Sequence, residues 1–170
     1  PRSPLPGAGA RLRGPVRRVI AGLAAPKFRF SVNFFGAPAL SLQEFAGFQQ
    51  DLIIGASLQV SPPMGQYDES RLVNLGTNRW SFKPELGVSK ALGRLTLEGA
   101  AAVTLYMDND DFYQGRSRSQ DPLYSLQGHL IYSFQSGVWG SLDGTYFTGG
   151  RTTLDGELNN DLQQNWRVGA

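Results

Sequence analysis

The chain contains one histidine, His129, the residue type best suited to proton chemistry near neutral pH. If the segments flanking Ser136 pair as an antiparallel hairpin whose partner numbers sum to 272, His129 faces Asp143. The neighbours on the same face are Gln127, Ile131 and Ser133. A membrane-embedded hydrolase would need a nucleophilic serine beside the histidine on the side that faces lipid, whereas this pair lies on the polar face. We therefore predict ordinary hydrogen bonding, with a pH-sensitive contact as the alternative, and no catalytic residue.

A second ionisable group comprises Lys83, Glu85 and Glu98, in two segments joined by a tight turn around Leu92-Gly93. A register whose partner numbers sum to 185 places small residues opposite these charges: Ala102 opposite Lys83, Ala100 opposite Glu85 and Gly87 opposite Glu98. Such a cluster could form a charged constriction. We favour the alternative, in which ion pairs satisfy the charges and brace the sheet.

Two further features concern local chemistry. Pro84, between two of these charges, removes a ladder hydrogen bond and predicts a bulge or distorted pairing. The run of residues 108–111 (DNDD) resembles the start of a calcium loop, but the fifth and sixth positions are Phe and Tyr where an oxygen ligand and Gly are required. Turn formation by the Asp and Asn side chains is the favoured role, with a looser oxygen-ligand site in this loop as the alternative, so no metal site is predicted.

The two arginines that follow this run, Arg116 and Arg118, are expected to be solvated. The alternative is that they contact phosphate groups of lipopolysaccharide.

All these residues lie in or beside segments in which polar and apolar residues alternate. In residues 80–107, one parity carries Trp, Phe, Leu and Val while the other carries Ser, Lys, Glu and Thr. This period predicts strands with one apolar and one polar face, long enough to cross a bilayer when tilted. Seven strands are predicted, over residues 28–34, 51–61, 80–90, 95–107, 122–135, 138–148 and from 165 onward. Residues 42–48 suggest a short helix with Ser41 and Glu44 as a capping box.

The connections alternate in length, which is typical of outer-membrane barrels. Long loops cover residues 62–78, 107–121 and 149–162, and short turns cover residues 91–94 and 136–137. Aromatic residues near the strand ends match the interfacial bands of such barrels: Trp80, Phe82, Tyr124, Tyr132 and Phe134. We predict an all-β fold, an antiparallel transmembrane β-barrel, with a soluble β-barrel or sandwich as the alternative.

Composition agrees with a turn-rich β-protein. Of 170 residues, 18% are charged, 11% are aromatic and 21 are glycine. A net charge of +2 provides no strong field to attract nucleic acid, and the absence of cysteine excludes disulfides and thiolate metal sites. Seven strands is an odd number, so residues 22–170 are expected to be part of a larger, even-stranded barrel. Residues 1–21 are interpreted as an irregular, disordered lead-in, with a signal peptide over residues 11–25 as the alternative.

Several longer motifs resemble one family. They include DLIIGASLQVSPPMGQYD (51–68), LVNLGTNRWSFKPELGVSK (72–90), DNDDF (108–112), RSQDPLYSLQG (118–128), GGRTT (149–153) and NNDLQQ (159–164). This is the Gram-negative outer-membrane transporter family of the putative meta-pathway of phenol degradation, and the resemblance covers residues 22–170. It implies a β-barrel in the bacterial outer membrane, in contact with lipid and lipopolysaccharide. It also implies passive uptake of small hydrophobic or aromatic compounds, without catalytic residues or a cofactor.

The residues expected to line the lumen follow from strand parity. They are Lys83, Glu85, Glu98, Thr96, Thr104, Tyr106, Gln127, His129 and Asp143. A structural barrel without a transport pathway, a membrane-embedded hydrolase and a soluble ligand-binding barrel are the other functions considered.

Overall fold

The structure is a computed structural model that describes residues 21–134 and 137–170. Apart from Ala21, the expected irregular lead-in lies outside these ranges, as does the first part of the alternative signal peptide. The turn residue Ser136 also falls outside them. In the ranges described, none of the helices combines the length and apolar character needed to cross a membrane.

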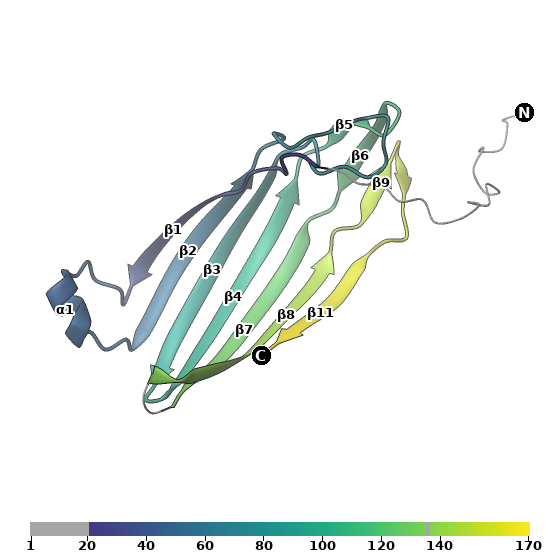
Figure 1. Cartoon of the computed structure of the whole chain (residues 1–170). Helices are drawn as coiled ribbons and strands as arrows, with labels where there is room; N and C mark the ends of the chain where they lie inside the picture. Colours follow the sequence, from purple (N-terminus) through teal and green to yellow (C-terminus); the bar gives the residue numbers. More distant parts are fainter. Residues whose placement is uncertain (1–20, 135–136) are drawn as a thin grey trace, which may run out of the picture.

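Seven strands form one antiparallel sheet, called the main sheet, in which neighbouring strands are hydrogen-bonded to each other (Figure 1). The strands are β1 (Phe28–Phe35), β2 (Leu52–Ser61), β3 (Ser81–Leu92), β4 (Leu95–Tyr106), β7 (Leu123–Ser133), β8 (Trp139–Gly149) and β11 (Gln163–Gly169). Their order is β1-β2-β3-β4-β7-β8-β11, so the sheet is open, with β1 and β11 at its edges. The predicted all-β antiparallel architecture is confirmed, and the described part of the barrel is not closed.

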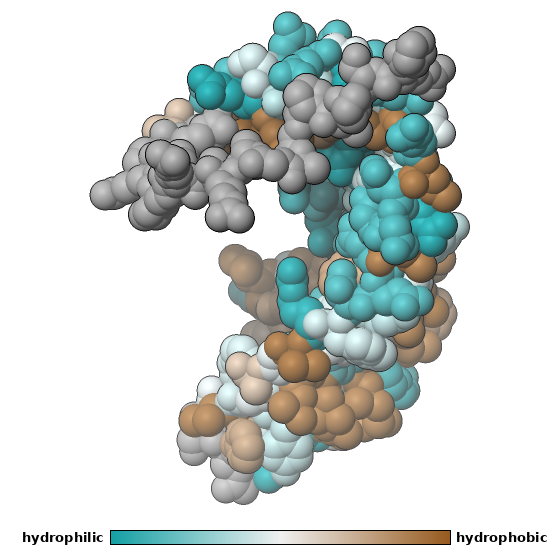
Figure 2. All heavy atoms as spheres, turned by 90° about the vertical axis from the view of Figure 1, so that its right-hand side faces the viewer, coloured by the Kyte–Doolittle hydropathy of each residue, from teal (hydrophilic) through white to brown (hydrophobic). Residues whose placement is uncertain are grey.

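The sheet curves into a shell with a polar concave face and an apolar convex face. Figure 2 shows the curvature, with apolar side chains over the lower outer side and hydrophilic ones over the upper end. No hydrophobic residue is buried among those the structure describes. Large apolar side chains of one parity are exposed instead, for example Phe30 (65%), Leu86 (62%) and Leu126 (62%). A soluble barrel or sandwich would bury such residues in a packed interior, so this face needs an apolar surrounding.

The register of the β3–β4 hairpin differs from the prediction by two residues. Observed partners sum to 187, as in Glu85 opposite Ala102, and not to 185. The cause is the position of the turn, which consists of Gly93 and Arg94 and is therefore centred one residue later than the predicted turn around Leu92-Gly93. Gly93 has a φ of +64°, a conformation that glycine adopts without strain at the first central position of a two-residue hairpin turn. A shift of two preserves parity, so each residue keeps its face while its partner changes.

The β7–β8 register is confirmed. Partners sum to 272, and His129 lies opposite Asp143.

Pro84 interrupts pairing without a bulge. The β3–β4 register is the same at Phe82 and at Glu85, but Lys83 and Pro84 have no partners in β4. On the other side of β3, Pro84 lies opposite Leu58 in an unbroken β2–β3 register. Distorted pairing is therefore confirmed, and the alternative of a bulge is wrong at this site.

The predicted helix is present as α1 (Leu42–Gly47), at the short-turn end of the sheet (Figure 1). The backbone N–H of Ser41 donates to Glu44 Oε2 at 2.8 Å, and the N–H of Glu44 donates to Ser41 Oγ at 3.4 Å. These two contacts form the expected capping box. Glu44 has a lowered pKa because the Ser41 backbone and hydroxyl donate hydrogen bonds to its carboxylate.

Two of the long loops contain a second sheet that the sequence did not predict. Its strands are β5 (Asn109–Phe112), β6 (Arg116–Gln120), β9 (Thr152–Leu154) and β10 (Glu157–Leu158), in the order β10-β9-β6-β5. Figure 1 places these strands beyond the upper ends of the main strands, opposite α1. We call these strands, together with residues 62–80, the loop layer.

Asp161 ties the chain after β10 back to the start of β9. Its carboxylate accepts hydrogen bonds from the hydroxyl of Thr152 at 2.6 Å and from the backbone N–H of Thr152 at 2.9 Å. The hydroxyl and then the N–H lower the pKa of Asp161 below its ordinary value of 3.8. The Asp161 carboxylate therefore binds its proton less tightly in the folded loop than in the unfolded chain.

We expect this contact to contribute its full stability at neutral pH, since a depressed carboxylate pKa favours the folded state above the unfolded pKa. The contribution should decline below pH 3.8 and vanish once the pH falls below the folded pKa. An NMR titration of the Thr152 amide resonance should show a midpoint below 3.8 that disappears in Asp161→Ala. A midpoint at or above the ordinary value would contradict the assignment.

Candidate functional site

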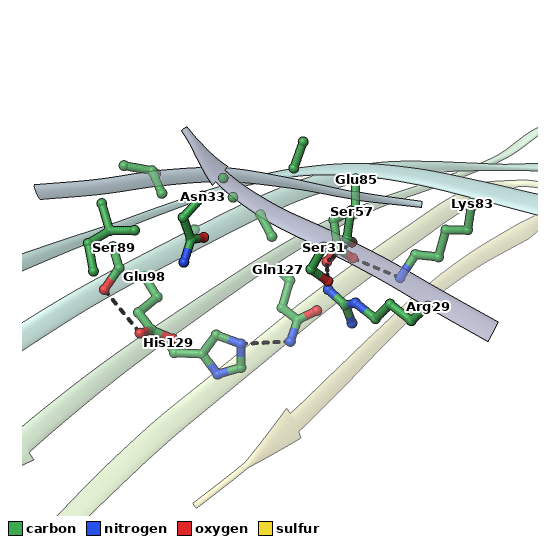
Figure 3. A pocket seen from close by; sticks show the side chains of 17 residues that line it. Arg29, Ser31, Asn33, Ser57, Lys83, Glu85, Ser89, Glu98, Gln127 and His129 are labelled. Atoms are coloured by element: carbon green, nitrogen blue, oxygen red, sulfur yellow. Dashed lines mark hydrogen bonds and ion pairs between the residues drawn. The ribbon is translucent and has the colours of Figure 1, made fainter. Parts of the chain in front are cut away.

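The concave face carries polar and charged side chains from five consecutive strands, β1, β2, β3, β4 and β7 (Figure 3). They line a hollow of about 370 Å³. The charged and hydrogen-bonding residues around it are Arg29, Ser31, Asn33, Ser57, Lys83, Glu85, Ser89, Glu98, Gln127 and His129. All occupy positions of the polar parity, which is why the alternating sequence brings them to one surface.

Glu85 is the centre of the first group. Its carboxylate forms an ion pair with Lys83 Nζ at 3.0 Å and a second one with the guanidinium of Arg29. The hydroxyl of Ser57 donates to Glu85 Oε1 at 3.4 Å. The Glu85 side chain is only 14% exposed, whereas that of Arg29 is 55% exposed. One carboxylate therefore links β1, β2 and β3 across the polar face.

Glu98 belongs to a different group from the one predicted. In the observed register Glu98 lies opposite Ser89, whose hydroxyl donates to Glu98 Oε1 at 3.1 Å. Gln50 Nε2 in turn donates to Ser89 Oγ at 2.6 Å. The predicted position opposite Gly87 is wrong because the turn lies one residue later than predicted, which moves the pairing by two. The expected cluster of Lys83, Glu85 and Glu98 is thus divided between two places on the same face.

His129 and Asp143 form the third group. His129 Nδ1 contacts the Asp143 carboxylate, and His129 Nε2 lies 2.6 Å from the amide nitrogen of Gln127. Since an amide nitrogen only donates, Nε2 is the acceptor and Nδ1 carries the proton that Asp143 accepts. Ser141 Oγ donates to Asp143 Oδ2 at 3.1 Å and does not contact the histidine. A nucleophilic triad needs the serine at the free imidazole nitrogen, which Gln127 occupies here.

The remaining predicted positions share the concave parity of β4 but lie outside the hollow. Thr96 is near the short turn, opposite Ala91 and Ile131. Thr104 lies opposite Leu123 near the other end. The ring of Tyr106, at the last residue of β4, lies 4.4 Å from the guanidinium carbon of Arg79.

Comparison with known proteins identifies a matching family model and a similar solved structure. A family model described as "Putative MetA-pathway of phenol degradation" matches residues 20–170. The chain belongs to this family. Its structure is similar to the crystal structure of an outer membrane channel from Pseudomonas putida F1, with a TM-score of 0.73 and 25% sequence identity. The similarity covers 88% of this chain and 53% of that chain, so this chain spans about half the length of the channel. None of the curated proteins compared matches it.

Two groups of aromatic residues lie toward opposite ends of the strands in this member of the phenol-degradation family. They are the residues that the sequence predicts to form interfacial bands. Trp80 and Phe82 stack with ring centroids 6.1 Å apart where the loop layer meets the start of β3. Tyr132 and Phe134 pack edge to face at 4.9 Å near the short turns. Tyr124, at the loop-layer end of β7, is 55% exposed. Their placement agrees with two interfacial bands, which remains a prediction for this chain.

Sequence reasoning missed several contributors to the polar face and its aromatic neighbours, among them Arg29, Ser57 and Trp166. Arg29 has the correct parity in its strand, but its partner Glu85 lies 56 residues away and two registers must be known to join them. Ser57 lies directly opposite Glu85, but the long connection between β2 and β3 left their register unpredicted. The ring of Trp166 packs on that of Tyr146, with centroids 4.6 Å apart. In the last strand Trp166 and Val168 alternate with polar residues, a pattern that could have identified Trp166.

Replacing Glu85 by Gln should destabilise the folded sheet by about 1–2 kcal/mol, because Lys83 and Arg29 would lose their shared counter-charge. The urea midpoint of the protein in detergent micelles measures this change. Ser57→Ala, which removes one long hydrogen bond from the same carboxylate, should have a smaller effect. The double variant Lys83→Met/Glu85→Gln should recover part of the loss. Equal midpoints for Glu85→Gln and the wild type would show that this ion pair does not brace the sheet.

Proposed function

We propose that this chain forms part of the wall of a β-barrel channel in the bacterial outer membrane. The observation that supports this most directly is the opposition of its two faces. Exposed apolar side chains cover the convex side, whereas ionic and hydrogen-bonding groups occupy the concave side. A soluble protein would place its apolar residues inside, and a barrel wall in lipid does the reverse. The structural similarity to an outer membrane channel supports the same assignment.

The strand dimensions also support insertion in a bilayer. The strands β2, β3, β4, β7 and β8 are 10 to 12 residues long. A tilted strand needs about 9–11 residues to cross the hydrocarbon layer. Short turns connect these strands at one end and the loop layer lies at the other, which corresponds to the periplasmic and outer sides of such barrels.

The proposed activity is passive diffusion of a small hydrophobic or aromatic solute past the concave face. The family description, which refers to phenol degradation, supports an aromatic solute. The hollow on this face combines hydrogen-bonding groups with the apolar side chains of Ile53 and Ala100, so its lining is polar without being purely ionic. Residues of the Glu85, Glu98 and His129 groups would line the path, together with Thr96, Thr104 and Tyr106. No residue is proposed to be catalytic.

The alternative is a barrel whose interior is closed and whose role is structural. One observation favours it: Glu85 and Asp143 are each satisfied by neighbouring side chains of the same wall. Charges that satisfy one another can brace a wall without contacting a solute. Flux measurements separate the two functions.

A matched pair of alanines tests which face meets lipid. Ala101 lies on the convex face and the adjacent Ala100 lies on the concave face, next to Gly87. Ala101→Arg should cost about 2–4 kcal/mol in the hydrocarbon layer and reduce the yield of heat-modifiable, folded protein in outer-membrane fractions. Ala100→Arg should fold and insert normally. Equal yields for the two variants would remove the membrane assignment.

A matched pair of glycines tests transport. A side chain at Gly87 would project into the hollow, and the nearest atom to its Cβ is 3.8 Å away. A side chain at Gly144, which has the convex parity of β8, would meet no atom within 4 Å. The folded protein should support liposome swelling in arabinose, several-fold less for Gly87→Phe and unchanged for Gly144→Phe. Phenol should transiently block the ionic current in a planar bilayer. Folded protein without swelling or current would favour the closed barrel.

A further inference from the structure

The loop layer contains a second cavity, separate from the concave hollow. It has a volume of about 240 Å³ and lies between residues 67–79 and the β5–β6 hairpin. Its walls include Tyr67, Leu72, Arg79, Asn109, Phe112 and Arg118. Two arginines, two large apolar side chains and two hydrogen-bonding groups therefore surround one small space.

The wall of this cavity is held by a hydrogen-bond network centred on Asn109, which is 3% exposed. Asn109 Nδ2 donates to Tyr67 Oη at 3.1 Å and to the carbonyl of Thr77 at 3.2 Å. Its Oδ1 accepts from Asn78 Nδ2 at 3.1 Å and from the backbone N–H of Asp111 at 3.2 Å. The amide is fully used, so it fixes two loops against each other and holds the wall of the cavity in place.

Arg79 carries an unsatisfied donor. The residue is 8% exposed, its Nη2 donates to Gln120 Oε1, and its guanidinium lies over the ring of Tyr106. Within the described residues, its buried Nη1 has no hydrogen-bond partner. Buried donors are nearly always paired in folded proteins, with protein, water or a bound ligand. An acceptor from outside the chain is therefore expected beside this guanidinium.

Arg118 adds a second positive charge. Its guanidinium carbon lies 5.1 Å from the ring centroid of Phe112. Its charge helps to lower the pKa of the Asp161 carboxylate, but it forms no ion pair of 4 Å or less in the part of the chain that is described. Burial and then the charge of Arg118 lower the pKa of Arg79, while Tyr106 and Asp108 act in the opposite direction. An anion in the cavity would reduce the repulsion between the two guanidinium groups.

We propose that this cavity binds a small monocarboxylate with an apolar body. The carboxylate would pair with Arg118 and Arg79, because planar guanidinium groups match the geometry of a carboxylate. The apolar body would contact Phe112 and Leu72, whose side chain is 63% exposed. The cavity is thus an outer capture site for an aromatic or aliphatic acid. It lies in the loop layer and stands independently of the transport proposal.

Calorimetric titration of the complete protein in detergent with benzoate tests this site. Benzyl alcohol, which has the same ring and no charge, is the matched ligand. We expect saturable binding of benzoate, and binding about tenfold weaker or absent for benzyl alcohol. Arg118→Gln should weaken benzoate binding by about tenfold, the loss that corresponds to one charge-assisted contact. Arg79→Gln should weaken it further in protein that is first shown to be folded.

Arg116→Gln is the matched control, since Arg116 lies on the same strand but pairs with Asp155 at 3.0 Å and does not line the cavity. It should bind benzoate as the wild type does. Equal weakening by Arg116→Gln and Arg118→Gln, equal binding of benzyl alcohol, or no saturable binding to folded protein would overturn the proposal. Binding of inorganic phosphate in preference to benzoate would also overturn it, by assigning the arginines to phosphate groups such as those of lipopolysaccharide. Liposome swelling with the same variants reports on the channel separately.

Discussion

The structure depends on the pairing of backbone groups between long antiparallel strands. Among the residues described, no hydrophobic side chain is buried, so the hydrophobic core that normally stabilises a domain contributes nothing here. Hydrogen bonds between neighbouring strands connect the main sheet from β1 to β11. In an apolar environment each unpaired backbone group costs several kcal/mol, which makes continuous pairing obligatory. The two open edges of this sheet are therefore the part of the structure that most needs further pairing.

Pairing also determines which polar groups meet. Once the backbone ladder is set, the period of two assigns each side chain to a face, and the register selects its neighbours. The concave face shows both effects. Parity alone brings Lys83, Glu85 and Glu98 to one surface, but the turn at Gly93 and Arg94 determines that Glu98 meets Ser89. The ionic groups are consequently distributed along the wall, and no described part of it concentrates all three charges at one level.

The sequence predicted the strands and faces well because those depend on local alternation. It also predicted the partnership of His129 with Asp143, where a short connection leaves few registers to consider. The β3–β4 register was wrong because the turn lies one residue later than predicted, at Gly93 and Arg94, and this displacement changes the partners while preserving parity. Arg29 shows a different limit. Its contact with Glu85 requires two successive registers across connections of unequal length, and no local pattern specifies them.

The loop layer was the least predictable part, for a physical reason. Its strands are two to five residues long, too short for a period of two to be recognised. They are stabilised by side-chain contacts between loops, such as the hydrogen bonds from Asn109 to Tyr67 and Thr77. Such contacts bury polar groups, including the side chain of Arg79. No hydrophobic residue is buried among the described residues. A polar layer built this way must satisfy each donor individually. Nη1 of Arg79 has no hydrogen-bond partner among the described residues, and this open donor supports the proposed ligand site in the loop layer.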